Sequence, residues 1–207
     1  MCIRDRILYL HGFASSSESN KARLFRKTID KQKLNYQCIT PDLPNNVSEA
    51  FKFIENLIID IKPRFIVGSS LGGFYGTYFA EQFNLKSILL NPAVLPANGM
   101  KIYLGKNENY STGEKFEFTN LDIDVLKKFE NKIKQISLPE NYFVFLESGD
   151  EVLNYLTAVN YYCGSSMNIF FGGNHSLEMF EDNMRQVIKI LQSCLLYTSD
   201  AADDTPC

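Results

Sequence analysis

The amino-acid sequence predicts an α/β fold: a mostly parallel sheet of about six strands with helices on both faces and a small cap insertion. Two observations support this prediction. Short apolar runs alternate with amphipathic helical patterns along most of the chain, as they do in right-handed βαβ units. In addition, one run ends in a Gly-x-Ser-x-Gly sequence, residues 68–72, immediately before a helical pattern. The 207 residues are enough for one domain with a sizeable core.

Short apolar runs closed by Gly, Pro, Asn or polar residues predict the strands, and apolar residues recurring at helical spacing predict the helices. The strands are expected at residues 7–10, 36–40, 65–67, 87–90, 142–146 and 167–171. The helices are expected at about 20–33, 48–62, 75–83 and 176–191, with a further one beginning at Glu151. Ser19 or Asn20 can cap the first helix, and Pro63 ends the second.

The segment from about 96 to 139 breaks this alternation. It combines glycines with aromatic and polar residues and ends in a helix-like pattern at 125–133. A long excursion is usually functional or disordered, and the aromatic residues argue against disorder, so we expect an inserted cap. Its apolar residues either line an acyl pocket or seal the edge of the sheet. They are Met100, Ile102, Tyr103, Leu104, Tyr110, Phe116 and Phe118.

Both ends of the chain resemble translated adapter sequence from sequencing libraries. Met1-Cys-Ile-Arg-Asp can be encoded by a sequence whose reverse complement, shifted in frame, encodes Cys194-Leu-Leu-Tyr-Thr. We therefore predict that residues 1–6 and 194–207 are adapter-derived scars and that a single domain of this α/β fold covers residues 7–193, with the inserted cap at about 96–139. The alternative is a native basic start and an acidic, disordered tail.

Composition excludes several classes of function. Lys and Arg number 21 against 24 Asp and Glu, a formal net charge of −3, so no basic stripe is available for nucleic acid. Apolar stretches stop well short of the length of a membrane span. Without the predicted scars only Cys38 and Cys163 remain, which is too few for a disulfide framework. We expect a soluble domain without a membrane span.

Ser70 is the candidate nucleophile. It is the central serine of Gly68-Ser-Ser-Leu-Gly72, between a predicted strand and a predicted helix, as in a nucleophile elbow. The turn at such a serine is sharp, and glycines two residues away on either side avoid collisions with backbone. Ser69 lacks this flanking. A tightly packed or phosphate-binding turn is the alternative, but the spacing matches neither common phosphate-binding glycine motif.

A serine hydroxyl needs a neighbouring base, and the sequence has two histidines. In α/β-hydrolases the serine comes first, then the acid, then the histidine. His175 follows the last predicted strand and fits this order, whereas His11 precedes the serine. We therefore expect His175 to be the base and His11 to shape its loop.

Asp150 is the best candidate for the acid that orients the histidine. It lies just beyond the strand at 142–146, at the sheet edge where this architecture places its catalytic groups. Glu147, nearer the strand, and Glu151 are the alternatives. The loop after an early strand commonly supplies one oxyanion donor beside the amide after the serine, so the backbone N–H groups of Phe13 and Leu71 are expected in that role.

Six motifs together resemble the small bacterial YqiA-type esterases over residues 7 to about 191. They are Ile7-Leu-Tyr-Leu-His-Gly-Phe-Ala-Ser-Ser, Gly68-Ser-Ser-Leu-Gly-Gly-Phe-Tyr, Leu90-Asn-Pro-Ala-Val, Leu104-Gly-Lys-Asn-Glu-Asn with Thr112-Gly, Ser148-Gly-Asp-Glu-Val-Leu and Gly172-Gly-Asn-His-Ser. The resemblance implies an α/β-hydrolase with cytoplasmic esterase activity on acyl esters, with acyl-CoA thioesters among the candidates. It also implies a Ser70, Asp150 and His175 triad without metal or cofactor.

The residues and the resemblance together predict a serine hydrolase that cleaves a small-molecule carboxylic ester or thioester through an acyl-enzyme. Two alternatives remain. An acyltransferase on the same fold would pass the acyl group to an alcohol instead of water. A catalytically silent hydrolase-fold binding protein would not react at all, although the intact Ser, Asp and His argue against it.

Overall fold

The computed structural model describes residues 5–32 and 34–199, and its centre is a six-stranded parallel sheet. The strand order is β2-β1-β3-β4-β7-β8, and every neighbouring pair is parallel. The strands are β1 (Asp5–Leu10), β2 (Tyr36–Ile39), β3 (Phe65–Ser70), β4 (Lys86–Pro92), β7 (Tyr142–Glu147) and β8 (Ser166–Phe170). The predicted fold class is confirmed, and all six predicted strands are present.

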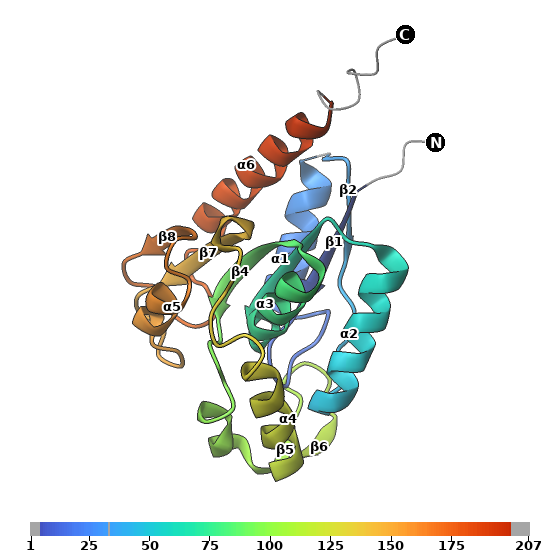
Figure 1. The fold of residues 1–207 in the computed structure, drawn as a ribbon, viewed down its shortest axis with the longest axis vertical. Coiled ribbons are helices and arrows are strands. Elements are labelled where there is room, and N and C mark those ends of the chain that lie inside the picture. The colour runs from blue at the N-terminus through green and yellow to red at the C-terminus, as the bar shows by residue number, and fades with distance from the viewer. Residues whose placement is uncertain (1–4, 33, 200–207) are drawn as a thin grey trace.

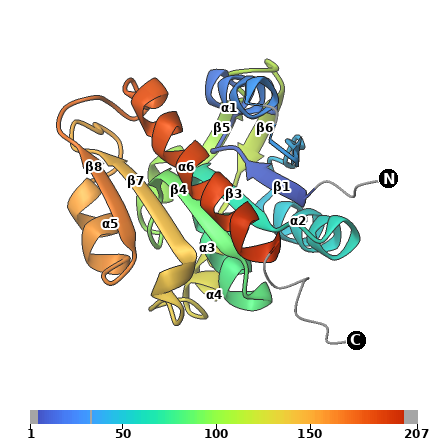
Figure 2. The ribbon, with the colours of Figure 1, turned by 90° about the horizontal axis from the view of Figure 1, so that it is seen from above.

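Helices cover both faces of the sheet. They are α1 (Asn20–Lys31), α2 (Val47–Ile61), α3 (Leu71–Phe83), α5 (Tyr155–Tyr161) and α6 (Phe180–Ser199). Ile7 and Tyr9 of β1 join the apolar cluster with α1 and α6, whereas Leu8 and Leu10 join the cluster with α2 and α3. Figure 2 shows α6 crossing one side of the sheet and α5 lying on the other. Because both faces are covered, the central strands are continuous apolar runs rather than alternating ones.

Several helix starts differ from the expectation: the last helix begins at Phe180 rather than at about residue 176, and the helix-like pattern at 125–133 is a helix over Asn120–Glu130. Helix α3 begins at Leu71, four residues before the predicted Tyr75. Its first turn contains two glycines, which have low helix propensity, so the residue pattern did not predict a helix there. Packing requires those glycines: a Cβ on Gly73 would lie 2.6 Å from the Cβ of Pro92. Helix α5 begins at Tyr155 with Asn154 as its N-cap, so Glu151 lies in the preceding loop rather than at a helix start.

The segment between β4 and β7 contains several elements of its own. They are two 3₁₀ helices, η1 (Gly99–Tyr103) and η2 (Pro139–Asn141), the antiparallel pair β5 (Gly105–Glu108) and β6 (Lys115–Phe118), and α4 (Asn120–Glu130). Figure 1 shows β5, β6 and α4 at the end of the molecule opposite the C-terminal end of α6. Phe129 of α4 stacks on Phe51 of α2 with ring centroids 3.5 Å apart, so the segment shares the core of the sheet.

The predicted domain ends fall partly outside the described residues, since 1–4 and 200–207 are not described. Within the described part, β1 begins at Asp5 and α6 extends to Ser199. Asp5 Oδ2 lies 2.6 Å from Arg64 Nη1, and Arg6 donates to the carbonyl of Ile61. The boundaries at 7 and 193 stay a prediction. No helix within residues 5–32 and 34–199 is both long and apolar enough to cross a membrane.

Removing the predicted scars tests this boundary. A chain of Met followed by residues 7–193 should fold, and its melting temperature should fall by no more than a few degrees. The described side-chain contacts that it loses at the start are the partly exposed Asp5–Arg64 pair and the hydrogen bond from Arg6 to the Ile61 carbonyl, and contacts of these kinds contribute about 0–1.5 kcal/mol each. Circular dichroism against temperature checks this. Loss of the cooperative transition would show that the ends belong to the domain.

Candidate active site

Ser70 lies at the sharp turn that joins β3 to α3. Its backbone has φ of 55° and ψ of −123°, a conformation that a non-glycine residue adopts only under strain. A Cβ on Gly68 would lie 2.4 Å from the carbonyl oxygen of Gly72, and a Cβ on Gly72 would lie 2.1 Å from that of Leu10. Both predicted glycine positions are therefore sterically required.

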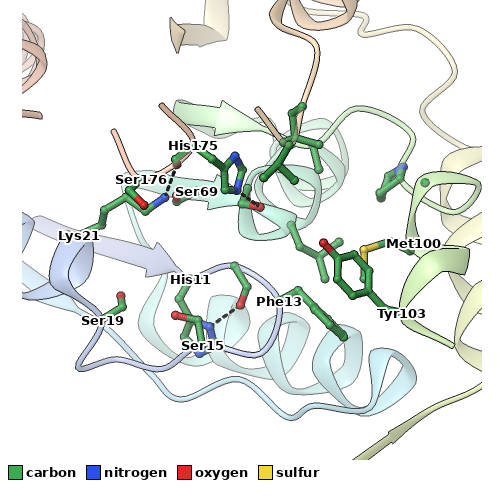
Figure 3. Close-up of a pocket in the computed structure, with 18 of the residues that line it drawn as sticks. His11, Phe13, Ser15, Ser19, Lys21, Ser69, Met100, Tyr103, His175 and Ser176 are labelled. Atoms are coloured by element: carbon green, nitrogen blue, oxygen red, sulfur yellow. Dashed lines mark hydrogen bonds between the residues drawn. The ribbon is translucent and has the colours of Figure 1, made fainter. Parts of the chain in front are cut away.

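The structure brings the predicted serine, histidine and aspartate together. Nε2 of His175 lies 3.1 Å from Oγ of Ser70, although the two residues are 105 positions apart in the chain. Nδ1 of His175 lies 2.8 Å from Oδ2 of Asp150. Figure 3 shows the His175 ring pointing into the pocket above Ser69, with a dashed line to the neighbouring serine oxygen. These contacts form a continuous chain from a hydroxyl through an imidazole to a carboxylate.

Asp150 is held in place by more than His175. Its Oδ1 accepts hydrogen bonds from the backbone N–H groups of Val152 at 2.9 Å and Leu153 at 2.7 Å. Burial alone would raise the pKa of Asp150, but the hydrogen bonds from His175, Leu153 and Val152 and the attraction to His175 hold that pKa below its usual value. The carboxylate is thus ionised at neutral pH and can orient His175 Nδ1–H.

The two alternative acids contact the backbone of the histidine loop rather than the imidazole. Glu147 is fully buried, and its carboxylate accepts hydrogen bonds from three backbone N–H groups, those of Asn174, Glu178 and Met179. Oε2 of Glu151 accepts a hydrogen bond of 2.9 Å from the backbone N–H of His175. Both glutamates therefore position the loop that carries the histidine.

Sequence reasoning missed this role of Glu147, although the pattern of β7 contains the signal. Side chains alternate along a strand, so Glu147 lies on the same face as Phe143 and Phe145, which pack toward α1 and α6. The loop with His175 leads into α6 across that face. A carboxylate at this position therefore meets the loop backbone. Asn91 was also missed: its side chain accepts from the N–H of Glu147 and donates to the carbonyl of Asn174.

His11 shapes the loop after β1, as expected. Its Nε2 accepts a hydrogen bond from the backbone N–H of Leu43, which leaves Nδ1 to donate to the carbonyl of Gly12, both at 2.9 Å. Burial lowers the pKa of His11, against smaller opposing effects of the Gly12 carbonyl and of Asp42. A neutral imidazole with both nitrogens engaged is a structural bridge rather than a base.

The two predicted oxyanion donors both line the pocket at Ser70. Leu71 is the first residue of α3, so its N–H has no partner within the helix. The loop before Phe13 passes close to the serine, since a Cβ on Gly12 would lie 3.1 Å from Ser70 Cβ. The Phe13 ring packs against Tyr103, with ring centroids 5.1 Å apart. The assignment of these two donors stays a prediction.

A pocket of about 530 Å³ opens above Ser70, and its two sides differ in character. One side is polar and includes Ser15, Ser19, Lys21 and Ser176. Met100 and Tyr103 lie on the other side, and the apolar lining of the pocket also includes Val94, Leu95, Ile102 and Tyr110. Figure 3 shows Lys21 and Ser176 on one side of His175 and Met100 and Tyr103 on the other.

The apolar residues of the 96–139 segment lie both at the pocket and in the core, and Met100 and Tyr103 contact both. Met100, Ile102, Tyr103 and Tyr110 line the pocket. Phe118 is buried in the core, and Phe116 packs against that same core cluster.

Within residues 5–32 and 34–199, no three His, Cys, Asp or Glu side chains gather as a metal site requires.

The sheet order, the strained turn at Ser70 and the helices on both faces define an α/β-hydrolase fold, which solved structures share. Est1E from Butyrivibrio proteoclasticus, in a structure with ferulic acid bound, is similar with a TM-score of 0.68 and 14% identity, over 93% of this chain and 88% of that one. Mouse alpha/beta hydrolase domain-containing protein 10 has a TM-score of 0.67 and 13% identity, over 90% of each chain. At these identities the likeness establishes the fold.

The chain belongs to the uncharacterised protein family UPF0227, whose model matches residues 6–192. A UPF0227 protein of Shewanella woodyi is 34% identical over 110 residues, or 51% of this chain and 60% of that protein. The UPF0227 protein YcfP of Escherichia coli is 25% identical over 153 residues, or 72% of this chain and 77% of that protein. The family resemblance indicated by the motifs is confirmed.

Proposed function

We propose that this protein is a serine esterase that hydrolyses carboxylic esters or acyl thioesters, in the cytoplasm, through an acyl-enzyme on Ser70. The observation that carries the proposal is the hydrogen-bonded chain from Ser70 Oγ through His175 to Asp150, at the floor of an open pocket. Hydroxyl, imidazole and carboxylate in this order are the parts that nucleophilic acyl transfer needs.

The proposed reaction has two halves. Ser70 Oγ bonds to the substrate's carbonyl carbon while its proton passes to Nε2 of His175, and the imidazolium then protonates the departing alcohol or thiol as the carbon–heteroatom bond breaks. Water next attacks the acyl-enzyme, with His175 taking one of its protons and returning it to Ser70 Oγ as the acid leaves. Asp150 stabilises the imidazolium in both halves.

The negative charge on the carbonyl oxygen develops at the start of α3. The N–H groups of Leu71 and Phe13 are the proposed donors to this oxyanion, and the positive end of the α3 dipole adds to their effect. The strained backbone at Ser70 supports this assignment, because it brings the serine oxygen and the first N–H of α3 to the same end of the pocket.

Known relatives are consistent with this chemistry. Among the solved structures of similar fold are Est1E and an esterase domain from Rhodothermus marinus, with TM-scores of 0.68 and 0.63. An acyltransferase would use the same triad and is separated by its acceptor: adding a primary alcohol would divert most of the product from acid to ester. A silent binding protein would show no covalent labelling at Ser70.

The first prediction tests the nucleophile. Ser70→Ala should abolish both ester turnover and labelling by a fluorophosphonate, with loss of several powers of ten in kcat, because it removes the attacking oxygen. Ser69→Ala is the matched control, since its hydroxyl takes no part in the Ser70–His175–Asp150 chain, and it should label normally. Labelling that is retained in Ser70→Ala and lost in Ser69→Ala would show that Ser69, not Ser70, is the nucleophile.

The second prediction separates the acid from its neighbour. Asp150→Asn should lower kcat by about four powers of ten at neutral pH, because the amide cannot hold the same histidine tautomer. Glu147→Gln should lower kcat far less but should lower the melting temperature, because a buried amide cannot accept the three backbone N–H bonds that the carboxylate accepts. The reverse ranking of the two kcat values would assign the acid to Glu147.

The third prediction concerns the apolar side of the pocket, which we propose holds the acyl chain. Tyr103→Ala should lower kcat/KM for long-chain p-nitrophenyl esters by an amount that corresponds to about 1–3 kcal/mol of transition-state stabilisation. It should change kcat/KM for short-chain esters little. The comparison needs esters of graded chain length and a melting curve. Equal losses at every length, with a lower melting temperature, would mean that Tyr103 only supports the fold.

A further inference from the structure

Lys21 is the one cationic side chain among the residues that line the pocket. It lies in the first turn of α1 and is half-buried, and its Nζ donates a hydrogen bond of 3.2 Å to the backbone carbonyl of His175. The proposed mechanism does not use it. Figure 3 shows Lys21 beside Ser176, on the opposite side of the His175 ring from Met100 and Tyr103.

The charges around Lys21 leave its ammonium available to a ligand. Three carboxylates attract it, those of Asp150, Glu147 and Glu151. Each is engaged elsewhere: Asp150 with the imidazole, and both glutamates with backbone N–H groups of the histidine loop. Among the described residues no ion pair within 4.0 Å joins Lys21 to a carboxylate, and the His175 carbonyl accepts one of its three N–H donors.

The position of His175 decides which part of a substrate meets Lys21. After attack, the acyl part stays bonded to Ser70, while the leaving group must come within hydrogen-bond distance of His175 Nε2 to receive its proton. The leaving group therefore lies on the side of the pocket formed by the histidine loop and α1. The acyl part extends toward the apolar side.

We propose that Lys21 is a specificity-determining residue that binds an anionic group on the leaving alcohol or thiol. The preferred substrates would then be esters or thioesters of an apolar acid with a leaving group that carries a carboxylate or phosphate. Ser19 and Ser176, which line the same side, provide hydroxyl groups for its polar atoms. This inference rests on the proposed esterase function, because it assigns one side of the same pocket.

The pH behaviour of Lys21 gives the proposal a second readout. Burial lowers the pKa of Lys21 to about 8, against the opposing attraction of Asp150, Glu147 and Glu151. The ammonium is therefore charged at neutral pH and loses its charge as the pH rises above about 8. A preference for anionic leaving groups should weaken over this range. Arginine at the same position would stay charged throughout.

The experiment compares two esters that differ in charge and little in size. A 4-nitrophenyl hexanoate with a ring carboxylate and its carboxamide counterpart release coloured phenolates, and kcat/KM is measured for each. For the unmodified protein the carboxylate ester should be preferred. Lys21→Met should reduce the carboxylate-to-carboxamide ratio about tenfold, the usual effect of losing one partly buried charge-assisted hydrogen bond. The matched control Lys27→Met removes an exposed charge from the same helix and should leave the ratio unchanged.

Lys21→Arg separates charge from packing. The Lys21→Arg variant should have the same carboxylate-to-carboxamide ratio of kcat/KM as the unmodified protein at neutral pH. Above about pH 8 the ratio should decline in the unmodified protein and stay constant in Lys21→Arg. If Lys21→Met lowers kcat equally for both esters and leaves their ratio unchanged, Lys21 only positions His175 and the proposal is wrong. If neither ester is hydrolysed and a fluorophosphonate does not label Ser70, the esterase function itself fails, and the proposal fails with it.

Discussion

The close approach of the start of α3 to the end of β1 is the constraint on which the site depends. Gly72 lies so near the carbonyls of Leu10 and His11 that no side chain fits between them. Ser70, two residues earlier at the same turn, adopts a positive φ of 55° and lines the pocket. The close approach also places the first free N–H of α3 beside the loop after β1. A single steric condition thus brings together the proposed nucleophile and the proposed oxyanion donors.

The histidine is held by a different kind of interaction. Buried polar groups at the ends of β4 and β7 bind the backbone of its loop, with Asn91 linking Glu147 to the Asn174 carbonyl. Because the Glu147 carboxyl group is fully buried, it needs several hydrogen-bond donors around it, and the loop provides them. The loop conformation and the burial of Glu147 therefore depend on each other. This coupling fixes the position of His175 relative to Ser70.

The inserted segment reaches the site through its own polar contacts. Asn109 is buried, and its side chain donates to the carbonyl of Ser15 while accepting from the turn between β5 and β6. The backbone N–H of Tyr110 donates to the carbonyl of Ala14. His11 and Asn109 therefore both hold the loop that carries Phe13. The sequence motif Leu104-Gly-Lys-Asn-Glu-Asn, which is part of the family resemblance, ends in Asn109 and therefore helps to hold the loop that carries Phe13.

The fold followed from the sequence, and so did a set of candidate residues that the structure brings together, because both rest on strong, local rules. Apolar runs bounded by turn residues identified the strands, and the glycine spacing around Ser70 with only two histidines left little choice of partners. The β5–β6 pair escaped prediction because its strands are four residues long and mostly polar. The role of Glu147 was missed because its partners are backbone N–H groups, which residue types do not identify; only its place on the inner face of β7 pointed to it.

The division of the pocket follows from the same architecture. Ser70 ends β3, and Asp150 and His175 lie on the loops that follow β7 and β8, so the parallel sheet positions all three candidate residues at one edge. The two sides of the pocket come from different segments, α1 with the histidine loop on one and the 96–139 segment on the other. Either side can change its residues without moving the sheet. Under the proposed function, the acyl group and the leaving group can therefore be selected independently, while the chemistry between them stays the same.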